Sequence, residues 1–169
     1  MKGFGSFRGF YKFEKEVNGL RERTDPVQAN ALFHLLLEAQ SLKQFLKDNE
    51  QEMQLQSFCE YITELCEKQG EVPEHIIKRT NLERSFGHQL FKGTRNPSRD
   101  TVLQLAFGFN ADVIRAQELL RYAGMSALYP RMKRDAVIIY CLHNRISIVE
   151  TQTILHELAL PLIGAGKTK

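Results

Sequence analysis

Basic side chains with the potential to bind phosphate are concentrated between residues 75 and 99. The stretch contains one acid, Glu83, and six bases, for a net charge of +5; the bases are Lys78, Arg79, Arg84, Lys92, Arg95 and Arg99. Lysine and arginine contact the phosphate groups of nucleic acids, and an arginine can also bridge the two acceptors of a guanine. Any one of these side chains alone would be interpreted as solvated, but their concentration in one short stretch indicates contact with nucleic acid.

Other kinds of chemistry have weaker candidates. Cys59 and Cys66 lie seven residues apart and His75 follows nine later, without the CxxC or HxxxH spacing of a zinc site. The tail at 164–168 reads Gly-Ala-Gly-Lys-Thr, but a phosphate-binding loop would need glycine where Pro161 stands. The five histidines have no acidic or nucleophilic partner at a catalytic spacing. We therefore expect no catalytic residue, no metal and no cofactor.

The composition is that of one folded domain with a small appendage. Of the 169 residues 43% are hydrophobic, which is enough for a core, and the net charge of +3 excludes a histone-like polycation and an acidic tail protein. This total conceals a polarised chain, because residues 38–71 carry eight acids against three lysines, a net −5, ahead of the basic stretch. No apolar run approaches the roughly 18 residues that span a bilayer, and the N-terminus lacks the apolar stretch of a signal peptide. The sequence therefore predicts a cytoplasmic protein with no membrane partner.

Helical periodicity predicts an all-α fold that begins with two N-terminal segments. Residues 1–24 carry glycines and basic residues, which suits either a disordered terminus or an arm that binds nucleic acid. Residues 25–56 are expected to form one amphipathic helix, because Asp25 and Pro26 are typical of a helix start and apolar residues follow at spacings of 3 and 4. That apolar seam consists of Leu32, Leu35, Ala39, Leu42 and Leu46. We expect it to pack on the main domain; a dimer interface is the alternative.

Further short helices are predicted over residues 57–70, 73–79, 83–91, 99–107, 111–123, 131–143 and 147–158. Ser98 can cap one of them, and Ser147 with Glu150 forms a capping box at the last. The Val-Ile run at 137–139 would also suit a strand, but no partner strand is evident. The basic run at 131–134 is interpreted as a solvated helix start, with a phosphate contact as the alternative. We expect these helices to form a domain at 57–124 and a C-terminal helical extension at 125–169.

The order of the helices between 57 and 124 resembles a known family. Helices 73–79 and 83–91 are joined by the tight connection Thr80-Asn81-Leu82, and the loop that follows at 93–98 reads Gly-x-x-Asn-Pro-Ser. In this order the chain resembles the lambda-repressor-like helix-turn-helix regulators, the XRE-type family of phage Cro and repressor proteins. Asn81 stands where such a turn usually has glycine, so a positive φ is expected there. The resemblance implies a five-helix domain, here with an N-terminal helix and a C-terminal helical hairpin.

The resemblance also implies which residues bind DNA. The helix at 83–91 would enter the major groove as the recognition helix. Its side chains that would contact bases are Arg84, Ser85, His88 and Gln89. The residues that would contact phosphate groups are Lys78, Lys92, Thr94, Arg95 and Asn96. The implied function is a non-enzymatic transcriptional regulator bound to double-stranded DNA, and a homodimer on a two-fold site is the arrangement typical of the motif.

Two features depart from the family pattern. The family commonly has glutamine or serine as a phosphate anchor where this chain has Val72-Pro73. The usual small residue of the first helix of the pair is replaced by Ile77, while Gly87 occupies the normally bulky position across from it. Large against small can fill the same gap between helices, so this exchange could be compensatory. The missing anchor favours an alternative function, a protein–protein interaction adaptor that reuses the fold.

Overall fold

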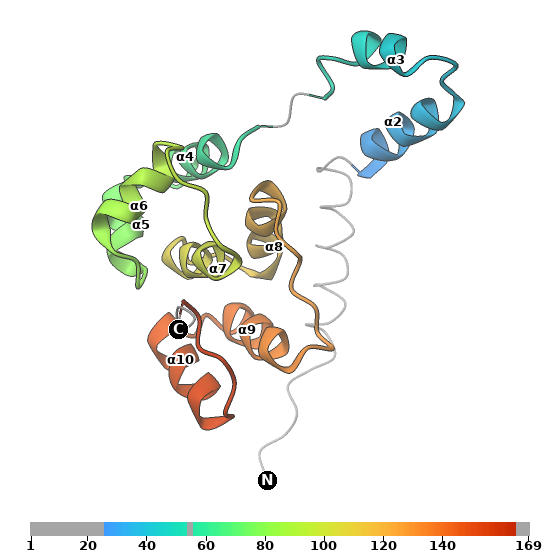
Figure 1. Cartoon of the computed structure of the whole chain (residues 1–169). Coiled ribbons are helices and arrows are strands. Elements are labelled where there is room, and N and C mark those ends of the chain that lie inside the picture. The colour runs from blue at the N-terminus through green and yellow to red at the C-terminus, as the bar shows by residue number, and fades with distance from the viewer. Residues whose placement is uncertain (1–25, 54–55, 165–169) are drawn as a thin grey trace. The chain divides into compact units, whose positions relative to one another are not determined.

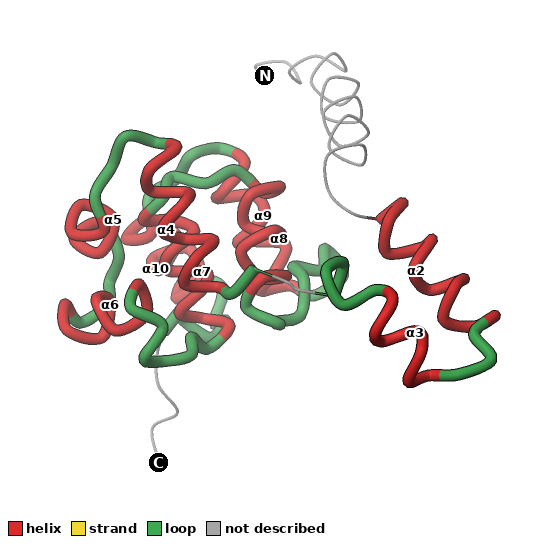
Figure 2. Tube along the Cα trace, turned by 90° about the horizontal axis from the view of Figure 1, so that it is seen from above, coloured by secondary structure: helices red, strands yellow, loops and turns green. Residues whose placement is uncertain are grey.

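The computed structural model describes residues 26–53 and 56–164, and in these ranges its regular secondary structure is helical, with no strand (Figure 1; Figure 2). The prediction of an all-α chain is confirmed for this part of the sequence. The chain divides into two compact units, Met1–Leu55 and Gln56–Lys169, which we call the N-terminal and the C-terminal unit. None of the described helices combines the length and the apolar character needed to cross a membrane.

The N-terminal unit contains two described helices, α2 (Pro26–Glu38) and α3 (Leu42–Asp48), which contact one another. The structure therefore differs from the single helix expected over residues 25–56. The break has a local cause, because Ser41 is extended and its side chain caps α3 by accepting a hydrogen bond from the Gln44 N–H. The expected cap at Asp25 and the expected arm at 1–24 lie outside the described residues.

The C-terminal unit consists of short helices joined by short connections. They are α4 (Phe58–Lys68), α5 (Pro73–Arg79), α6 (Arg84–Phe91), α7 (Arg99–Gly108), α8 (Val113–Tyr122), α9 (Lys133–His143) and α10 (Ile148–Glu157). Polar side chains cap five of these helices at their start, and Ser147 completes the expected capping box with Glu150; the caps are Ser57, Glu83, Ser98, Asp112 and Ser147. The Val-Ile run at 137–139 lies inside α9, so the strand alternative is wrong.

Helix α7 is the centre of the C-terminal unit. Every residue from Thr101 to Ala106 is buried, and α7 packs against both α5 and α8. A helix buried around its whole circumference must be covered by neighbours on all sides. Ile138 of α9, Leu155 of α10 and Ile163 join the same hydrophobic core, so the segment after Gly124 is built into this unit.

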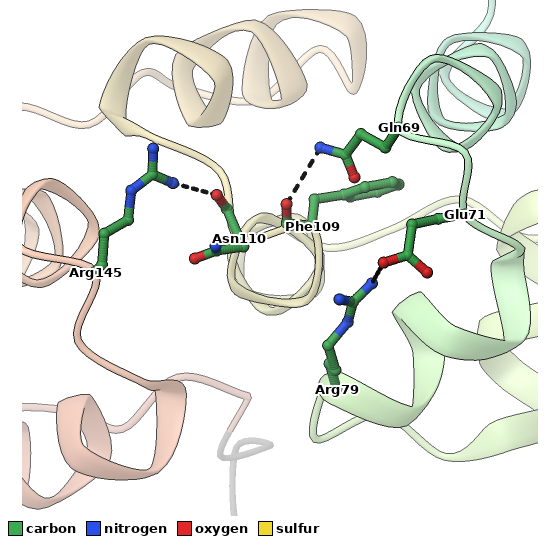
Figure 3. Close-up of a pocket in the computed structure, with 6 residues that line it drawn as sticks. All are labelled: Gln69, Glu71, Arg79, Phe109, Asn110 and Arg145. Atoms are coloured by element: carbon green, nitrogen blue, oxygen red, sulfur yellow. Dashed lines mark hydrogen bonds and ion pairs between the residues drawn. The ribbon is translucent and has the colours of Figure 1, made fainter.

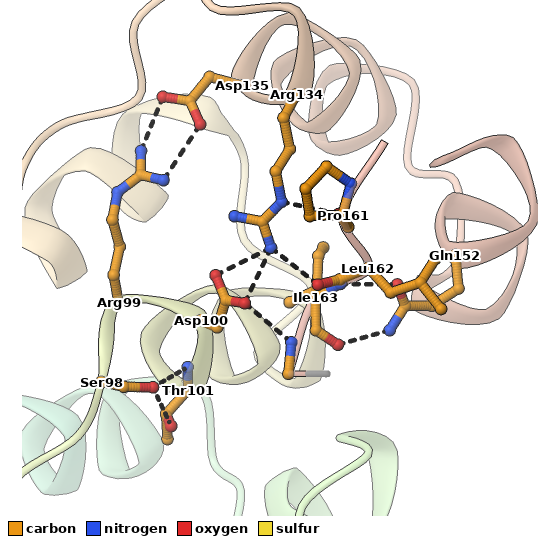
Figure 4. Close-up of polar contacts among 11 residues, drawn as sticks. Ser98, Arg99, Asp100, Thr101, Arg134, Asp135, Gln152, Pro161, Leu162 and Ile163 are labelled. Carbon is orange, nitrogen blue, oxygen red and sulfur yellow. Dashed lines mark hydrogen bonds and ion pairs between the residues drawn. The ribbon is translucent and has the colours of Figure 1, made fainter. Parts of the chain in front are cut away.

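Two Arg-Asp dipeptides join the start of α7 to the start of α9 (Figure 4). Arg99 of α7 forms an ion pair of 2.7 Å with Asp135 of α9, and Arg134 of α9 forms one of 2.8 Å with Asp100 of α7. We call this arrangement the crossed Arg–Asp pairs. The Asp135 side chain is only 1% exposed, so its charge is stabilised by Arg99 and by the Tyr129 N–H, which donates to it at 3.0 Å.

Arg134 also fastens the end of the described chain. Its guanidinium donates to the carbonyl oxygens of Pro161 and Leu162, and Asp100 accepts from the Gly164 N–H (Figure 4). The interpretation of 131–134 as a solvated helix start is therefore wrong for Arg134, which is also not available to a phosphate. The prediction failed for Arg134 because its acidic partner, Asp100, lies 34 residues away in the sequence.

Candidate nucleic-acid interface

The connection between α5 and α6 is held by a threonine. The Thr80 hydroxyl donates to the Ile77 carbonyl at 2.7 Å and accepts from the Leu82 N–H at 3.3 Å. The predicted positive φ at Asn81 is wrong: among the described non-glycine residues only Asn110, Arg145 and Ala159 have one. A side chain that bonds to nearby backbone groups can shape a tight connection without a left-handed residue. Here Thr80 does so.

Helices α5 and α6 approach one another through a glycine. A Cβ atom placed on Gly87 of α6 would lie 2.7 Å from Cγ2 of Ile77 on α5, closer than two carbon atoms tolerate. Both residues are buried. The side chain of Ile77 therefore occupies the space that a larger residue at 87 would fill, and the large-against-small exchange predicted from the sequence is present as a direct contact.

This contact predicts strong coupling between the two positions. Gly87→Ala is expected to lower the free energy of unfolding by about 1–3 kcal/mol through overpacking, although alanine is the better helix former. Ile77→Ala alone should cost about 2–5 kcal/mol through the cavity it leaves. In the double variant the new methyl group enters that cavity, so the sum of the single losses should exceed the double loss by at least about 1 kcal/mol. Urea unfolding of the four proteins measures this cycle, and additive losses would contradict the assigned contact.

Glu83 begins α6 and engages one of the predicted base-contacting residues. Its carboxylate accepts from the N–H groups of Ser85 at 2.8 Å and Phe86 at 2.9 Å and also from the Ser85 hydroxyl. The hydrogen bonds from Ser85 and then from Phe86 lower the pKa of Glu83 below its ordinary value. The helix thus starts at Arg84, one residue later than expected. Ser85 is hydrogen-bonded to the Glu83 carboxylate that caps the N-terminus of this helix.

Two more of the predicted base-contacting residues share one carboxylate. Glu74, in the first turn of α5, lies 2.7 Å from Nη2 of Arg84 and 2.8 Å from Nε2 of His88. The Arg84 side chain is 75% exposed, so this pair is open to solvent and easily broken. Glu74 was not predicted from the sequence. It stands one position before the basic stretch, and its spacing from Arg84 and His88 does not indicate that it pairs with residues of another helix. Gln89, the fourth residue, is half-buried.

The loop after α6 is folded back onto that helix. The N–H and the hydroxyl of Thr94 both donate to the carbonyl oxygen of Gln89, at 3.0 and 3.2 Å. Gly93 has φ +70°, a conformation that lets the chain reverse here. The other end is fixed by buried Pro97 and by Ser98, which caps α7. The predicted phosphate-contacting side chains of this loop are all exposed; they are Lys92, Thr94, Arg95 and Asn96.

Ion pairs reduce the positive charge of the basic stretch. Three of its six bases are paired with acids outside it; the pairs are Arg79–Glu71, Arg84–Glu74 and Arg99–Asp135. Subtracting these three acids lowers the net charge from +5 to +2. Within the described ranges Lys78, Lys92 and Arg95 form no ion pair, so the remaining charge is concentrated on the loop and on the exposed side of α5.

A polar pocket of about 330 Å³ lies beside α5, where the carboxyl ends of α4, α7 and α9 meet (Figure 3). Its lining residues are Gln69, Glu71, Arg79, Phe109, Asn110 and Arg145. Gln69 donates to the Phe109 carbonyl and Arg145 to the Asn110 carbonyl. Both side chains therefore provide hydrogen bonds to backbone carbonyl groups at the C-terminal end of α7. Arg79 and then His75 lower the pKa of Glu71 by hydrogen bonding. The polar groups of the pocket are thus engaged mainly with one another.

The described residues bring together no group of three His, Cys, Asp or Glu side chains that could hold a metal ion. Cys59, Cys66 and Cys141 are free thiols. Burial, the largest cause, raises the pKa of Cys66 to about 11, which keeps it protonated at neutral pH. His75, the third residue of the set considered from the sequence, is paired with Glu71.

Comparison with protein-family models, with curated proteins and with solved structures yields no match to this chain. The geometry and charge of α5, α6 and the loop at 92–98 are the features of this chain that bear on its function.

Proposed function

We propose that the C-terminal unit is a sequence-specific double-stranded DNA-binding domain of the lambda-repressor-like helix-turn-helix type, acting in transcription regulation without catalysis. The observation that carries the proposal is the loop at 92–98. It presents two cations that have no acidic partner among the described residues, Lys92 and Arg95, and it is hydrogen-bonded to the last turn of a helix with polar exposed residues. That combination supplies phosphate contacts directly beside side chains that read bases.

In this proposal α6 lies in the major groove with its amino-terminal half toward the bases. Arg84 would leave Glu74 and pair with a guanine, at a cost of about 0–1 kcal/mol, because the broken ion pair is solvent-exposed. The Glu74 carboxylate then stays near the groove, where it repels phosphate and can accept a hydrogen bond from a cytosine amino group. Glu74 would therefore add to sequence discrimination while lowering the affinity for DNA in general.

The direct test is a fluorescence-anisotropy titration of the full chain against random-sequence duplexes and against duplexes selected from a random pool. We expect binding at low salt that weakens steeply as salt is added, because phosphate contacts release counterions. Selected duplexes should bind more tightly than random ones. Absence of binding at micromolar protein in low salt would refute the proposal.

Arg84→Ala tests the assigned base contact. The change should cost about 1–3 kcal/mol on the selected duplex and relax the preference at one base pair, with little effect on random duplexes. Glu74→Gln is the matched variant: it removes a negative charge from the same ion pair and should tighten binding to both kinds of duplex. Titration of both variants on both duplexes measures this difference. Equal losses on selected and random duplexes for Arg84→Ala would overturn the role of Arg84.

A protein partner is the second candidate. It is favoured by Pro73, which begins α5 without a side-chain cap where the family has a phosphate anchor, and by the pairing of Arg84 with Glu74. An adaptor would use the same exposed side of α6 for an acidic partner surface. It predicts no affinity for any duplex at low salt, so the titration separates the two functions.

A further inference from the structure

Gln104 is a polar side chain in the middle of the buried helix α7. It is only 4% exposed, and its neighbours on both sides in the sequence are buried leucines. Burying an amide group costs free energy unless its polar atoms find hydrogen-bond partners, and a hydrocarbon side chain of the same length would avoid that cost. The packing of α7 alone therefore does not explain a glutamine at this position.

The hydrogen bond of Gln104 leads to the pair of helices that carries the proposed function. Its Nε2 donates at 3.3 Å to the carbonyl oxygen of Asn81, in the connection between α5 and α6. The other buried polar or charged side chains among the described residues are Thr101, Asp135 and Thr151. The two threonines form hydrogen bonds with the serine that caps their own helix, and Asp135 belongs to the crossed Arg–Asp pairs. Within this set, Gln104 is the residue that reaches the α5–α6 connection.

Helix α7 supports the same connection at a second point. Gly108 follows Gln104 by four residues, so both lie on one face of α7. A Cβ atom placed on Gly108 would lie 2.5 Å from Cγ2 of Thr80, the residue whose hydroxyl closes the connection. Two consecutive residues of the connection, Thr80 and Asn81, are therefore held against α7, the first by close packing and the second by the hydrogen bond from Gln104.

The amide of Gln104 is confined from its other side by Gly164. A Cβ atom placed on Gly164 would lie 2.6 Å from Nε2 of Gln104, so the backbone passes directly over the amide. Gly164 is itself fixed, because its N–H donates at 3.0 Å to Asp100, the partner of Arg134. The Gln104 side chain is thus enclosed between the α5–α6 connection and the backbone at 164. This enclosure limits its rotamers and directs its N–H group at Asn81.

We propose that Gln104 is a positioning residue for α6. Its hydrogen bond to the Asn81 carbonyl fixes the connection from which α6 begins, and thereby the angle at which Arg84 meets the bases. The inference rests on the proposed function and adds to it a buried residue that does not touch DNA. Asn81 precedes Arg84 by three residues, so a shift of the connection moves the start of α6 directly.

The two kinds of DNA contact should respond differently to the loss of Gln104. A bidentate contact to a base depends on the direction of the side chain and tolerates only small displacements. The phosphate contacts proposed for the loop at 92–98 depend mainly on charge and follow the opposite end of α6. Loss of the Gln104 hydrogen bond should therefore reduce discrimination between DNA sequences while leaving the general affinity for DNA unchanged.

Gln104→Met tests this role, because methionine keeps the length of the side chain and removes the donor. The measurement is the anisotropy titration of the full chain with selected and random duplexes. The ratio of the two affinities should fall at least about fivefold, the lower end of what one bidentate base contact contributes to discrimination. The affinity for random duplexes and its salt slope should stay at the wild-type values.

Gln117→Met is the matched control. Gln117 of α8 is half-buried, and its amide bonds to the carbonyl and the N–H of Leu128 at 2.9 and 2.8 Å, away from the α5–α6 connection. This variant should lower the midpoint of urea unfolding at least as much as Gln104→Met does, yet leave the affinity ratio unchanged. If Gln104 had only a structural role, its variant would behave in the same way as this control.

Gly164→Ala is the second variant, for the case in which Gln104→Met does not fold. Gly164 is exposed, and the added methyl group would push the Gln104 amide away from Asn81, so the affinity ratio should again fall. An unchanged ratio in Gln104→Met, or in Gly164→Ala where the methionine variant does not fold, would overturn the role of Gln104. Equal losses on selected and random duplexes would overturn it as well. Either result leaves the proposed function intact, whereas a wild-type chain that binds no duplex would refute both.

Discussion

Asp135→Ala is expected to lower the free energy of unfolding of the C-terminal unit by about 3–5 kcal/mol, the largest effect of any single substitution considered in this chain. Asp135 accepts from both terminal nitrogens of Arg99, at 3.1 and 2.7 Å, and from the Tyr129 N–H. Its removal leaves the Arg99 guanidinium, which is only 22% exposed, without its acid. Breaking a buried pair from one side costs more than the pair itself contributes, since the remaining charge stays desolvated.

Urea unfolding followed by circular dichroism measures this loss. Glu67→Ala is the control, because Glu67 is an exposed carboxylate in α4, and its substitution should stay within about 0.5 kcal/mol. The double substitution Arg99→Met/Asp135→Leu removes both charges and should recover most of the stability. A loss for Asp135→Ala no larger than that for Glu67→Ala would show that the crossed Arg–Asp pairs do not hold α9 to α7.

Lys92→Ala/Arg95→Ala is expected to weaken binding to every DNA sequence by about 60-fold at 0.1 M salt. Removing one bound phosphate lowers the slope of log affinity against log salt by about 0.9, which corresponds to about an eightfold weaker affinity per phosphate at that salt concentration. For two phosphates the slope should therefore become less steep by about 1.8. Neither side chain forms an ion pair within the described ranges, so the double substitution breaks no internal contact of that kind and the fold should be unaffected.

The control for this experiment removes the same charge from another place. Arg131 and Lys133 are exposed before and at the start of α9 and form no ion pair with a described residue. Arg131→Ala/Lys133→Ala should change both affinity and salt slope much less. Anisotropy titrations at several salt concentrations compare the two variants. Equal effects would mean that net charge attracts DNA to the protein as a whole, and the loop at 92–98 would lose its assigned role.

The helix positions were predictable because their signals are local. Ser98 and Ser147 cap helices with their own side chains a few residues away, so the sequence contains the full information for these starts. The break at Ser41 is also local, but the apolar spacing across it stays at 3 and 4, and this regular spacing favoured one continuous helix. At Asn81 the residue type suggested a left-handed turn, whereas the neighbouring Thr80 side chain closes the connection in another way.

The charge pattern of the candidate site was less predictable, because ion pairs are formed across the fold. Arg99 and Asp135 are 36 residues apart, and no spacing rule connects them. A count of charges within one stretch of sequence treats every base as unpaired. In the fold, however, Arg84 pairs with Glu74 and Arg99 pairs with Asp135. The turn and the helix cap of the loop at 92–98 were more predictable, since its glycine, proline and capping serine are local features.

Through the crossed Arg–Asp pairs, helices α9 and α10 help to position the loop at 92–98, although neither helix belongs to that loop. Arg99 is the first residue of α7 and directly follows the loop at 92–98, so the acid on α9 sets where the far end of that loop is anchored. A fragment ending at Gly124 would keep every residue that is proposed to contact DNA but would lack Asp135, the partner of Arg99. The smallest piece of the chain that keeps this ion pair therefore extends into α9, and α9–α10 supports the proposed DNA-binding surface.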